Sequence, residues 1–260
     1  MNDYDICDTY RITKSGGSVE GSQEKYLKDG YWYKRDLNGY EGLAEELVYK
    51  VLKCSNVSKY AVYERCTING QRGCRTKNFL RTEESLVTFQ YLYEMHTGGQ
   101  LSDYILKYSD VCDRVNATID LMFKYTNLDM TNYVSNTLHL DQLTLNTDRH
   151  FNNLAVILSE SGFSEAPIFD NGDGLLSSFH KFPAYKDIEE LIPKAYANPF
   201  SGSYRAQVCC LENHLKINYR ELFRLLSDYS DSRALNVLMY QLEQFENMYR
   251  DDSIITVFNP

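Results

Sequence analysis

Apolar residues follow two different periods along the chain, and the change near residue 80 divides the sequence. Over residues 39–54 (GYEGLAEELVYKVLKC), Leu43, Leu47 and Val51 recur every four positions, which predicts an amphipathic helix. Short strand-like runs interrupted by glycine surround this helix. After a hinge expected around residues 78–81, helical spacing dominates. The pattern predicts an α+β chain with a β-rich first part and a mainly α-helical second part.

Two glycine-containing turns predict how the strands of the first part pair. Asp29-Gly30 precedes the aromatic run YWYK, and Asn69-Gly70 divides an alternating stretch. Asn-Gly and Asp-Gly are strong signals for two-residue hairpins. The expected order in this part is strand, strand, helix, strand, strand.

The second part carries five stretches with helical spacing, at residues 83–96, 101–109, 115–135, 219–229 and 232–250. Residues 140–180 break this pattern with a polar insertion, and a strand pair at 154–158 and 167–169 is expected to follow it.

The insertion LTLNTDRHFNNLAVIL, residues 143–158, places an acid, two bases and three amides inside an apolar run. Burying such groups without partners would cost about 1–3 kcal/mol each, so something must satisfy them. Phosphoryl transfer from ATP needs a carboxylate that orients the acceptor hydroxyl, and hard oxygen ligands for magnesium. On this interpretation Asp148 takes the hydroxyl, while Asn153 and Asp170 hold Mg²⁺. The alternative is an Asn/Asp-rich loop that caps a helix and turns a hairpin.

A nucleotide site also needs a loop that covers phosphates and a lysine upstream. The first hairpin offers glycines, among them Gly21, that let backbone N–H groups approach phosphates, and Lys34 at the end of its second strand. Glu41 or Glu45 of the following helix is the expected partner of Lys34. Lys34 is otherwise a solvated strand lysine, and either glutamate is otherwise simple charge at a helix N-terminus.

The segments GSQEK, YWYK, EGLAEELVYKVL, NTDRHFNN and IFDNG, in this order, resemble the HipA-like serine/threonine kinases, including the short CtkA-type members. NTDRHFNN matches that family's pattern N-x-D-x-H-x-x-N, and GSQEK matches its G-x-Q-x-K. The resemblance implies a two-lobed protein-kinase-like fold, with an N-lobe at residues 1–80 and a C-lobe at 81–260. It also implies ATP and Mg²⁺ as cofactors and a protein with a Ser or Thr acceptor as partner.

Roles for individual residues follow from the same resemblance. Asp148 is the expected catalytic aspartate, Asn153 and Asp170 are the metal ligands, and Lys34 contacts the α- and β-phosphates. His150 supports the catalytic loop, or is instead a core-facing histidine satisfied by backbone. The remaining nucleotide-binding positions are Gly21, Ser22 and Gln23 of GSQEK.

Two departures from the family limit what carries over. Larger members have an additional N-terminal subdomain that contacts partners, for which this sequence has no room, so an antitoxin or regulatory protein is only a candidate partner. Many relatives phosphorylate a serine of their own phosphate loop, and Ser18 and Ser22 are the candidates here. Phosphate on Ser18 would add about −1.5 to −2 charge beside the ATP phosphates and inhibit binding.

Charge and cysteine usage narrow the kinds of partner and the cellular location that the sequence predicts. A net charge of −9 and a pI near 5.1 argue against direct binding of nucleic acid, which requires a basic surface. The seven cysteines show no C-x-x-C spacing, and reduced thiols in a cytosol are expected. No leader peptide or membrane span is expected, so a cytoplasmic location is predicted, with export or translocation as an effector left open.

Three functions compete. The first is a protein Ser/Thr kinase that acts as a toxin or effector. The second is a small-molecule or lipid kinase of the phosphoinositide type, where DRHxxN also occurs. The third is a nucleotide-binding pseudokinase regulator, which would not need the hydroxyl-orienting Asp148.

Overall fold

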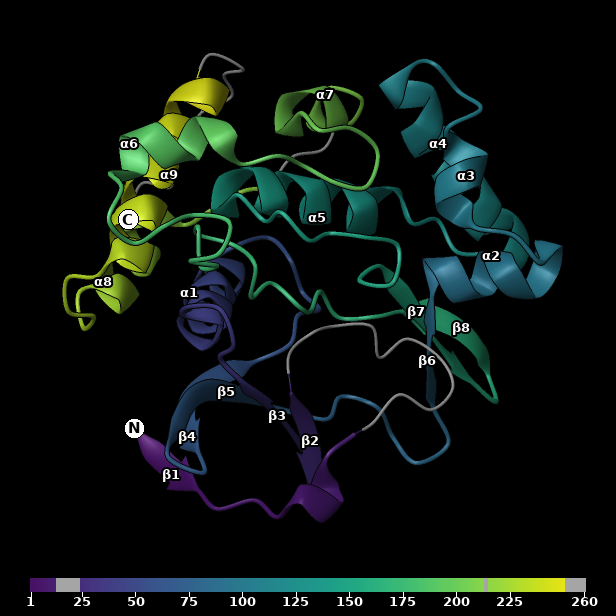
Figure 1. The fold of residues 1–260 in the computed structure, drawn as a ribbon. Helices are drawn as coiled ribbons and strands as arrows, with labels where there is room; N and C mark the ends of the chain where they lie inside the picture. The colour runs from purple at the N-terminus through teal and green to yellow at the C-terminus, as the bar shows by residue number, and fades with distance from the viewer. Residues whose placement is uncertain (13–23, 213–214, 251–260) are drawn as a thin grey trace.

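The computed structural model describes residues 1–12, 24–212 and 215–250, and the described chain combines two β-sheets with a largely helical second part (Figure 1). The strands are β1 (Asn2–Tyr4), β2 (Lys25–Lys28), β3 (Tyr31–Arg35), β4 (Tyr63–Ile68), β5 (Gln71–Lys77), β6 (Ser85–Thr88), β7 (Ala155–Ser159) and β8 (Gly162–Glu165). The α-helices are α1 (Glu41–Lys53), α2 (Phe89–Thr97), α3 (Leu101–Ile105), α4 (Val111–Thr126), α5 (Thr131–Thr144), α6 (Ile188–Leu191), α7 (Tyr204–Val208), α8 (Tyr219–Leu226) and α9 (Arg233–Arg250), and the 3₁₀ turns are η1 (Asp8–Tyr10) and η2 (Ile192–Lys194).

The N-terminal sheet has five strands in the order β1-β4-β5-β3-β2. Both predicted hairpins are present, and Asp29-Gly30 and Asn69-Gly70 all have positive φ, as a tight two-residue hairpin turn requires. The sequence pattern missed β1, which pairs in parallel with β4 and is only three residues long.

Helix α1 packs on this sheet and confirms the helix predicted over residues 39–54. Its N-terminal turn comes unusually close to β5 at Gly42, where a Cβ atom would lie 2.6 Å from the backbone carbon of Gly73. The two glycines therefore allow helix and strand backbones to touch. This contact fixes where the next turn of α1, which carries Glu45, stands relative to β3.

The second sheet, in the order β6-β7-β8, corrects two sequence predictions. Residues 85–88 were expected to be helical but form β6, because Leu86 and Val87 pair with β7 and the helix begins only at Phe89. The strand expected at 167–169 is instead a single parallel bridge between Ile168 and Tyr60, and β7 pairs with β8. The segment before Asp170 therefore lies against the chain between α1 and β4 rather than in a hairpin.

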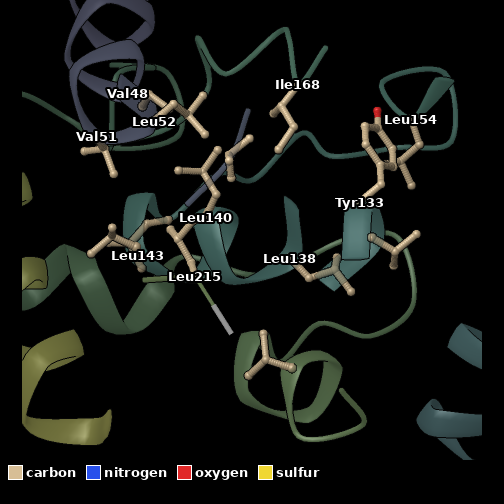
Figure 2. Packing of buried hydrophobic residues seen from close by; sticks show 14 of the residues in the cluster. Val48, Val51, Leu52, Tyr133, Leu138, Leu140, Leu143, Leu154, Ile168 and Leu215 are labelled. Carbon is tan, nitrogen blue, oxygen red and sulfur yellow. The ribbon is translucent and has the colours of Figure 1, made fainter. Parts of the chain in front are cut away.

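One hydrophobic core joins the N-terminal helix to the helical part. Figure 2 shows Val48 and Leu52 of α1 facing Leu140 and Leu143 of α5, with Ile168 nearby, and all belong to one buried cluster. Helix α5 lies at the centre of the helical part (Figure 1) and is buried over almost its whole length. The division at residue 80 stays a prediction, since this core crosses it.

The expectation of reduced thiols is wrong for two of the seven cysteines. Cys112, in the first turn of α4, forms a disulfide with Cys210, which follows α7. Sequence spacing cannot reveal this pair, because its members lie 98 residues apart and meet only through the packing of α4 and α7. Within the described ranges, none of the helices combines the length and the apolar character needed to cross a bilayer.

Candidate active site

Lys34, Glu45 and Asp170 converge from three separate elements. The Nζ atom of Lys34, on β3, lies 2.6 Å from Oδ1 of Asp170 and 2.9 Å from Oε1 of Glu45, on α1. The hydroxyl of Tyr63, on β4, accepts a further hydrogen bond from Lys34 at 3.4 Å. Lys34 is 6% exposed and Glu45 1%, so the alternative of a solvated strand lysine is wrong.

The charges of this cluster reinforce one another. Burial alone would lower the pKa of Lys34, but the carboxylates of Asp170 and Glu45 raise it well above its ordinary value. Burial likewise opposes ionisation of Asp170, yet Lys34 and Lys25 hold the pKa of that carboxyl far below its usual range. Asp170 is therefore an ionised carboxylate at neutral pH, and Lys34 is an ammonium group.

The structure decides between the two glutamates that the sequence left open. Glu45 contacts Lys34, and its other carboxylate oxygen accepts the N–H of Asn171 at 2.9 Å. The Glu41 carboxylate instead accepts the backbone N–H groups of Asn38 and Gly39 at 2.7 and 3.2 Å, and so binds the turn that leads into α1. Glu41 therefore lies at the N-terminus of α1 as a simple helix-terminal charge, which was the alternative that the sequence offered for it.

The loop 146–153 brings Asp148 and Asn153 together through its backbone. The Asn153 side-chain amide donates to the carbonyl of Asp148 at 3.0 Å, and the Asn146 side chain accepts the N–H of Asp148 at 3.0 Å. The side chain of Asp148 is about half exposed (51%). The backbone carbonyl of His150 accepts the N–H of Asn153 at 2.8 Å, which closes the turn.

The ring of His150 is not core-facing, which removes the alternative offered for it. Its side chain is 37% exposed, and Nε2 lies 3.9 Å from the Asp148 carboxylate. Nδ1 is enclosed and has no hydrogen-bond partner in the part of the chain described. Support for the loop therefore comes from the His150 backbone, and its ring lies beside the expected catalytic acid.

Arg149 is the site residue that sequence reasoning missed. It is completely buried, and its guanidinium makes two hydrogen bonds of 2.9 Å to Asp141 of α5. It also donates to the Asn171 side chain at 2.6 Å and to the Phe169 carbonyl at 2.9 Å, on either side of Asp170. Arg149 therefore ties the Asp148 loop to the Asp170 segment. The available signal in the sequence was Asp141, the single acid between residues 131 and 144, just before the loop.

Asp148 has three charged neighbours from other segments. Burial, followed by the negative charge of Asp173 and more weakly that of Asp170, raises the pKa of Asp148 above its ordinary value, and His150 and Lys181 oppose that rise. Asp148 and Asp170 thus share one electrostatic environment. The Asp170 backbone itself is left-handed (φ 59°), a conformation that Asp adopts more readily than most residues, and it turns the chain just after Phe169.

The expected phosphate-loop positions Gly21, Ser22 and Gln23 lie outside the described residues, as does Ser18. The chain on either side of that loop is described. The N–H of Ile12 donates to the carbonyl of Lys25 at 2.9 Å, so the two flanks pair as neighbouring strands. Lys25 faces the cluster, with Nζ 3.6 Å from Asp170.

The oxygen donors fit magnesium held jointly with phosphate. Asp170 supplies an ionised carboxylate, and the Asn153 amide nitrogen already donates to Asp148, which leaves its oxygen for a cation. Among the described residues no group of three or more His, Cys, Asp or Glu side chains could hold a metal alone. Magnesium is commonly bound by one or two protein oxygens together with substrate phosphates, and Asn153 and Asp170 would supply two such oxygens.

The loop 198–205 contacts the catalytic loop from outside. The Asn198 amide donates to the Thr147 carbonyl at 3.0 Å, and the Tyr204 hydroxyl donates to the Asn146 carbonyl at 2.9 Å. Both contacts fall just before Asp148, so this loop positions the expected catalytic acid.

Comparison with solved structures relates this arrangement to a known fold. The crystal structure of CtkA, described as a proinflammatory kinase of Helicobacter pylori, aligns over 95% of this chain and 94% of its own with a TM-score of 0.65 and 16% identity. The chain therefore shares the fold of this kinase. The HipA-like resemblance drawn from the sequence motifs is thereby confirmed at the level of the fold.

HipA of Shewanella oneidensis MR-1, solved with HipB and its operator DNA, aligns at 12% identity over 93% of this chain and 58% of its own, with a TM-score of 0.41. No protein-family model matches the sequence, and no curated protein sequence matches it.

Proposed function

We propose that this HipA-like chain is an ATP- and Mg²⁺-dependent kinase that phosphorylates Ser or Thr of a protein. One observation carries the proposal: Lys34, Glu45 and Asp170 form a buried charge cluster, and Arg149 links that cluster to the loop of Asp148 and Asn153. A phosphate-binding cation, a metal-binding carboxylate and a hydroxyl-orienting acid are the parts that phosphoryl transfer needs.

Each residue has a distinct task in this proposal. Lys34 binds the α- and β-phosphates and is held by Glu45, while Asn153 and Asp170 supply oxygens to Mg²⁺. When bound, Mg²⁺ neutralises charge on the phosphates. Asp148 orients the acceptor hydroxyl and receives its proton; its raised pKa brings it closer to the pKa range of an effective general base.

The partner is a protein that exposes a Ser or Thr, and an antitoxin or other regulatory partner stays a prediction from the sequence. So do a toxin or effector role, a cytoplasmic location and phosphorylation of Ser18 or Ser22. Mass spectrometry of the protein after brief expression, alone and with Asp148→Asn, tests autophosphorylation directly.

Transfer of label from radiolabelled ATP with Mg²⁺ tests the function. We expect Asp148→Asn to retain nucleotide binding but to lose transfer by about 10²-fold or more. Asp170→Ala should lose the Mg²⁺-dependent part of nucleotide binding, whereas Asp228→Ala, at an exposed acid just after α8, should behave as wild type.

The acceptor decides between the competing functions. Label on a protein supports the proposal, and label on a lipid or metabolite replaces it with a small-molecule kinase. Tight Mg²⁺-dependent ATP binding with no transfer to any acceptor would leave a pseudokinase.

A further inference from the structure

Lys181 lies on a segment that is anchored from both parts of the molecule. The N–H of Phe179 donates to the Asn38 carbonyl at 2.7 Å, ahead of α1. On the other side of Lys181, Phe182 is buried, and Arg233 of α9 donates to the Phe182 and Pro183 carbonyls at 3.1 Å each. The backbone that carries Lys181 is therefore fixed by three hydrogen bonds to two residues distant in sequence, Asn38 and Arg233.

The Lys181 side chain turns from this segment towards the catalytic loop. Its Nζ atom lies 3.2 Å from the hydroxyl of Thr147 and 3.4 Å from Oδ1 of Asp173. Thr147 is 2% exposed and immediately precedes Asp148. The Lys181 side chain is itself 31% exposed, so its ammonium group is both held in place and open to a ligand.

The other cations near Asp148 are already engaged. Arg149 is completely buried and bound to Asp141, Asn171 and the Phe169 carbonyl, and Lys34 is enclosed by Asp170 and Glu45. The loop 146–153 contains no lysine. Around the Asp148 carboxylate the acidic neighbours are Asp173 and Asp170, and the basic neighbours are His150 and Lys181. Lys181 is thus a partly exposed lysine beside the expected catalytic acid.

We propose that Lys181 is a catalytic residue that contacts the phosphoryl group as it moves from ATP to the acceptor hydroxyl. This inference rests on the proposed function. In the step, the bond between the γ-phosphorus and the β,γ-bridging oxygen breaks, and its electron pair leaves with ADP. A bond forms from the Ser or Thr oxygen to the same phosphorus, and the hydroxyl proton passes to Asp148. Lys181 releases Asp173 and neutralises negative charge on the transferring oxygens.

Lys181→Met and Lys181→Arg test this role, with Lys186→Met as the matched control. Lys186 lies five residues further along the same segment, and its Nζ pairs on the surface with the Glu190 carboxylate at 3.6 Å. Calorimetry with Mg²⁺ and either ADP or an ATP analogue with a β,γ-methylene bridge measures contact with the γ-phosphoryl group. Single-turnover transfer from ATP measures the step, and thermal unfolding confirms that each variant is folded.

We expect Lys181→Met to lose most of the difference in affinity between the analogue and ADP, and to slow single-turnover transfer about 100-fold. The KM for an acceptor protein should stay unchanged, Lys181→Arg should recover part of the rate, and Lys186→Met should match wild type.

Transfer by Lys181→Met at the wild-type rate would overturn the catalytic role of Lys181. A raised KM at an unchanged maximal rate would also overturn it, because Lys181 would then be a substrate-binding residue. A wild type that binds Mg²⁺ and analogue but transfers nothing would end the proposed function instead. In that case calorimetry would still test Lys181. If Lys181→Met keeps the wild-type difference in affinity between the ATP analogue and ADP, contact with the γ-phosphoryl group is refuted, and if that difference is lost, the contact is supported.

Discussion

At the scale of single residues, the site depends on a buried arginine that has no part in the expected chemistry. Arg149 is fully enclosed, and a buried guanidinium persists only where carboxylates and carbonyls surround it. Asp141 supplies the charge, and the oxygens of Asn171 and Phe169 complete the set. The polar insertion is therefore satisfied in part by protein groups, which answers why it can interrupt an apolar run.

Replacing Arg149 by Leu should lower the free energy of unfolding by about 3–5 kcal/mol, because Asp141 would be left buried and unpaired. Urea denaturation followed by circular dichroism measures the loss. The double variant Asp141→Leu with Arg149→Leu should recover part of it, and Arg65→Leu, which breaks the exposed pair with Glu46, should cost about 0–1 kcal/mol. A small loss in the free energy of unfolding for Arg149→Leu alone would show that water reaches the Arg149–Asp141 pair.

At the scale of elements, the N-terminus of α1 gathers two acids in a small volume. The Asp36 carboxylate accepts the N–H of Gly42, in the first turn of α1, at 2.6 Å, and the Glu41 carboxylate accepts the N–H of Asn38 just ahead of the helix at 2.7 Å. Burial, with a further contribution from Glu41, raises the pKa of Asp36 to about 6, although the Gly42 N–H opposes that rise. This helix start is therefore pH-sensitive, and it precedes the turn that carries Glu45.

The sign of the pH effect follows from proton binding. Because the folded protein holds the Asp36 proton more tightly than the unfolded chain does, this group's contribution to stability is present at about pH 4 and is lost as the pH rises through about 6. Asp36→Asn should raise the free energy of unfolding by about 1–2 kcal/mol at pH 8 and leave it unchanged near pH 4. Urea denaturation at both pH values measures this, and an equal effect at both would assign the change to something other than titration.

At the scale of the whole molecule, the two parts of the chain are joined by more than the shared core. Gly39, just before α1, forms a backbone bridge with Ser178, and the Tyr40 hydroxyl donates to the carbonyls of Leu175 and Leu176. Both leucines are buried with positive φ, a strained conformation for such residues. The segment after Asp170 is thus held against the N-terminal part of the chain in a shape it would not adopt alone.

Gly39→Ala tests this junction, since a Cβ atom there would lie 1.9 Å from the Ser177 carbonyl oxygen. We expect a loss of about 1–3 kcal/mol in the free energy of unfolding, together with slower phosphoryl transfer, because the displaced segment leads to Lys181. Gly99→Ala, where a Cβ would make ordinary contacts at 3.6 Å, is the control. Full stability and activity in Gly39→Ala would show that the two segments separate without cost.

Local chemistry made several features predictable. Asp29-Gly30 and Asn69-Gly70 specify hairpins through their own backbone preferences, and the four-residue spacing of Leu43, Leu47 and Val51 specifies α1. The motif residues Lys34, Asp148, Asn153 and Asp170 could be selected because phosphoryl transfer restricts the residue types and their order. The structure brings them into one neighbourhood, and their roles stay predictions.

Other features depend on contacts between distant segments, which no local pattern encodes. Glu41 and Glu45 lie one turn apart on the same side of α1, so only the position of β3 decides that Glu45 meets Lys34. The identity of β6 as a strand depends on β7, and the Cys112–Cys210 disulfide depends on α4 and α7.

The sequence by itself determined the turns, the first helix and the short list of residues able to do this chemistry, since backbone preference and functional-group chemistry act locally. Tertiary structure alone decided which glutamate holds Lys34, where Arg149 finds its carboxylate and how Lys181 comes to stand beside Asp148. Those choices are made by packing across many residues of chain, where the free energy of a contact depends on what the rest of the fold brings to it.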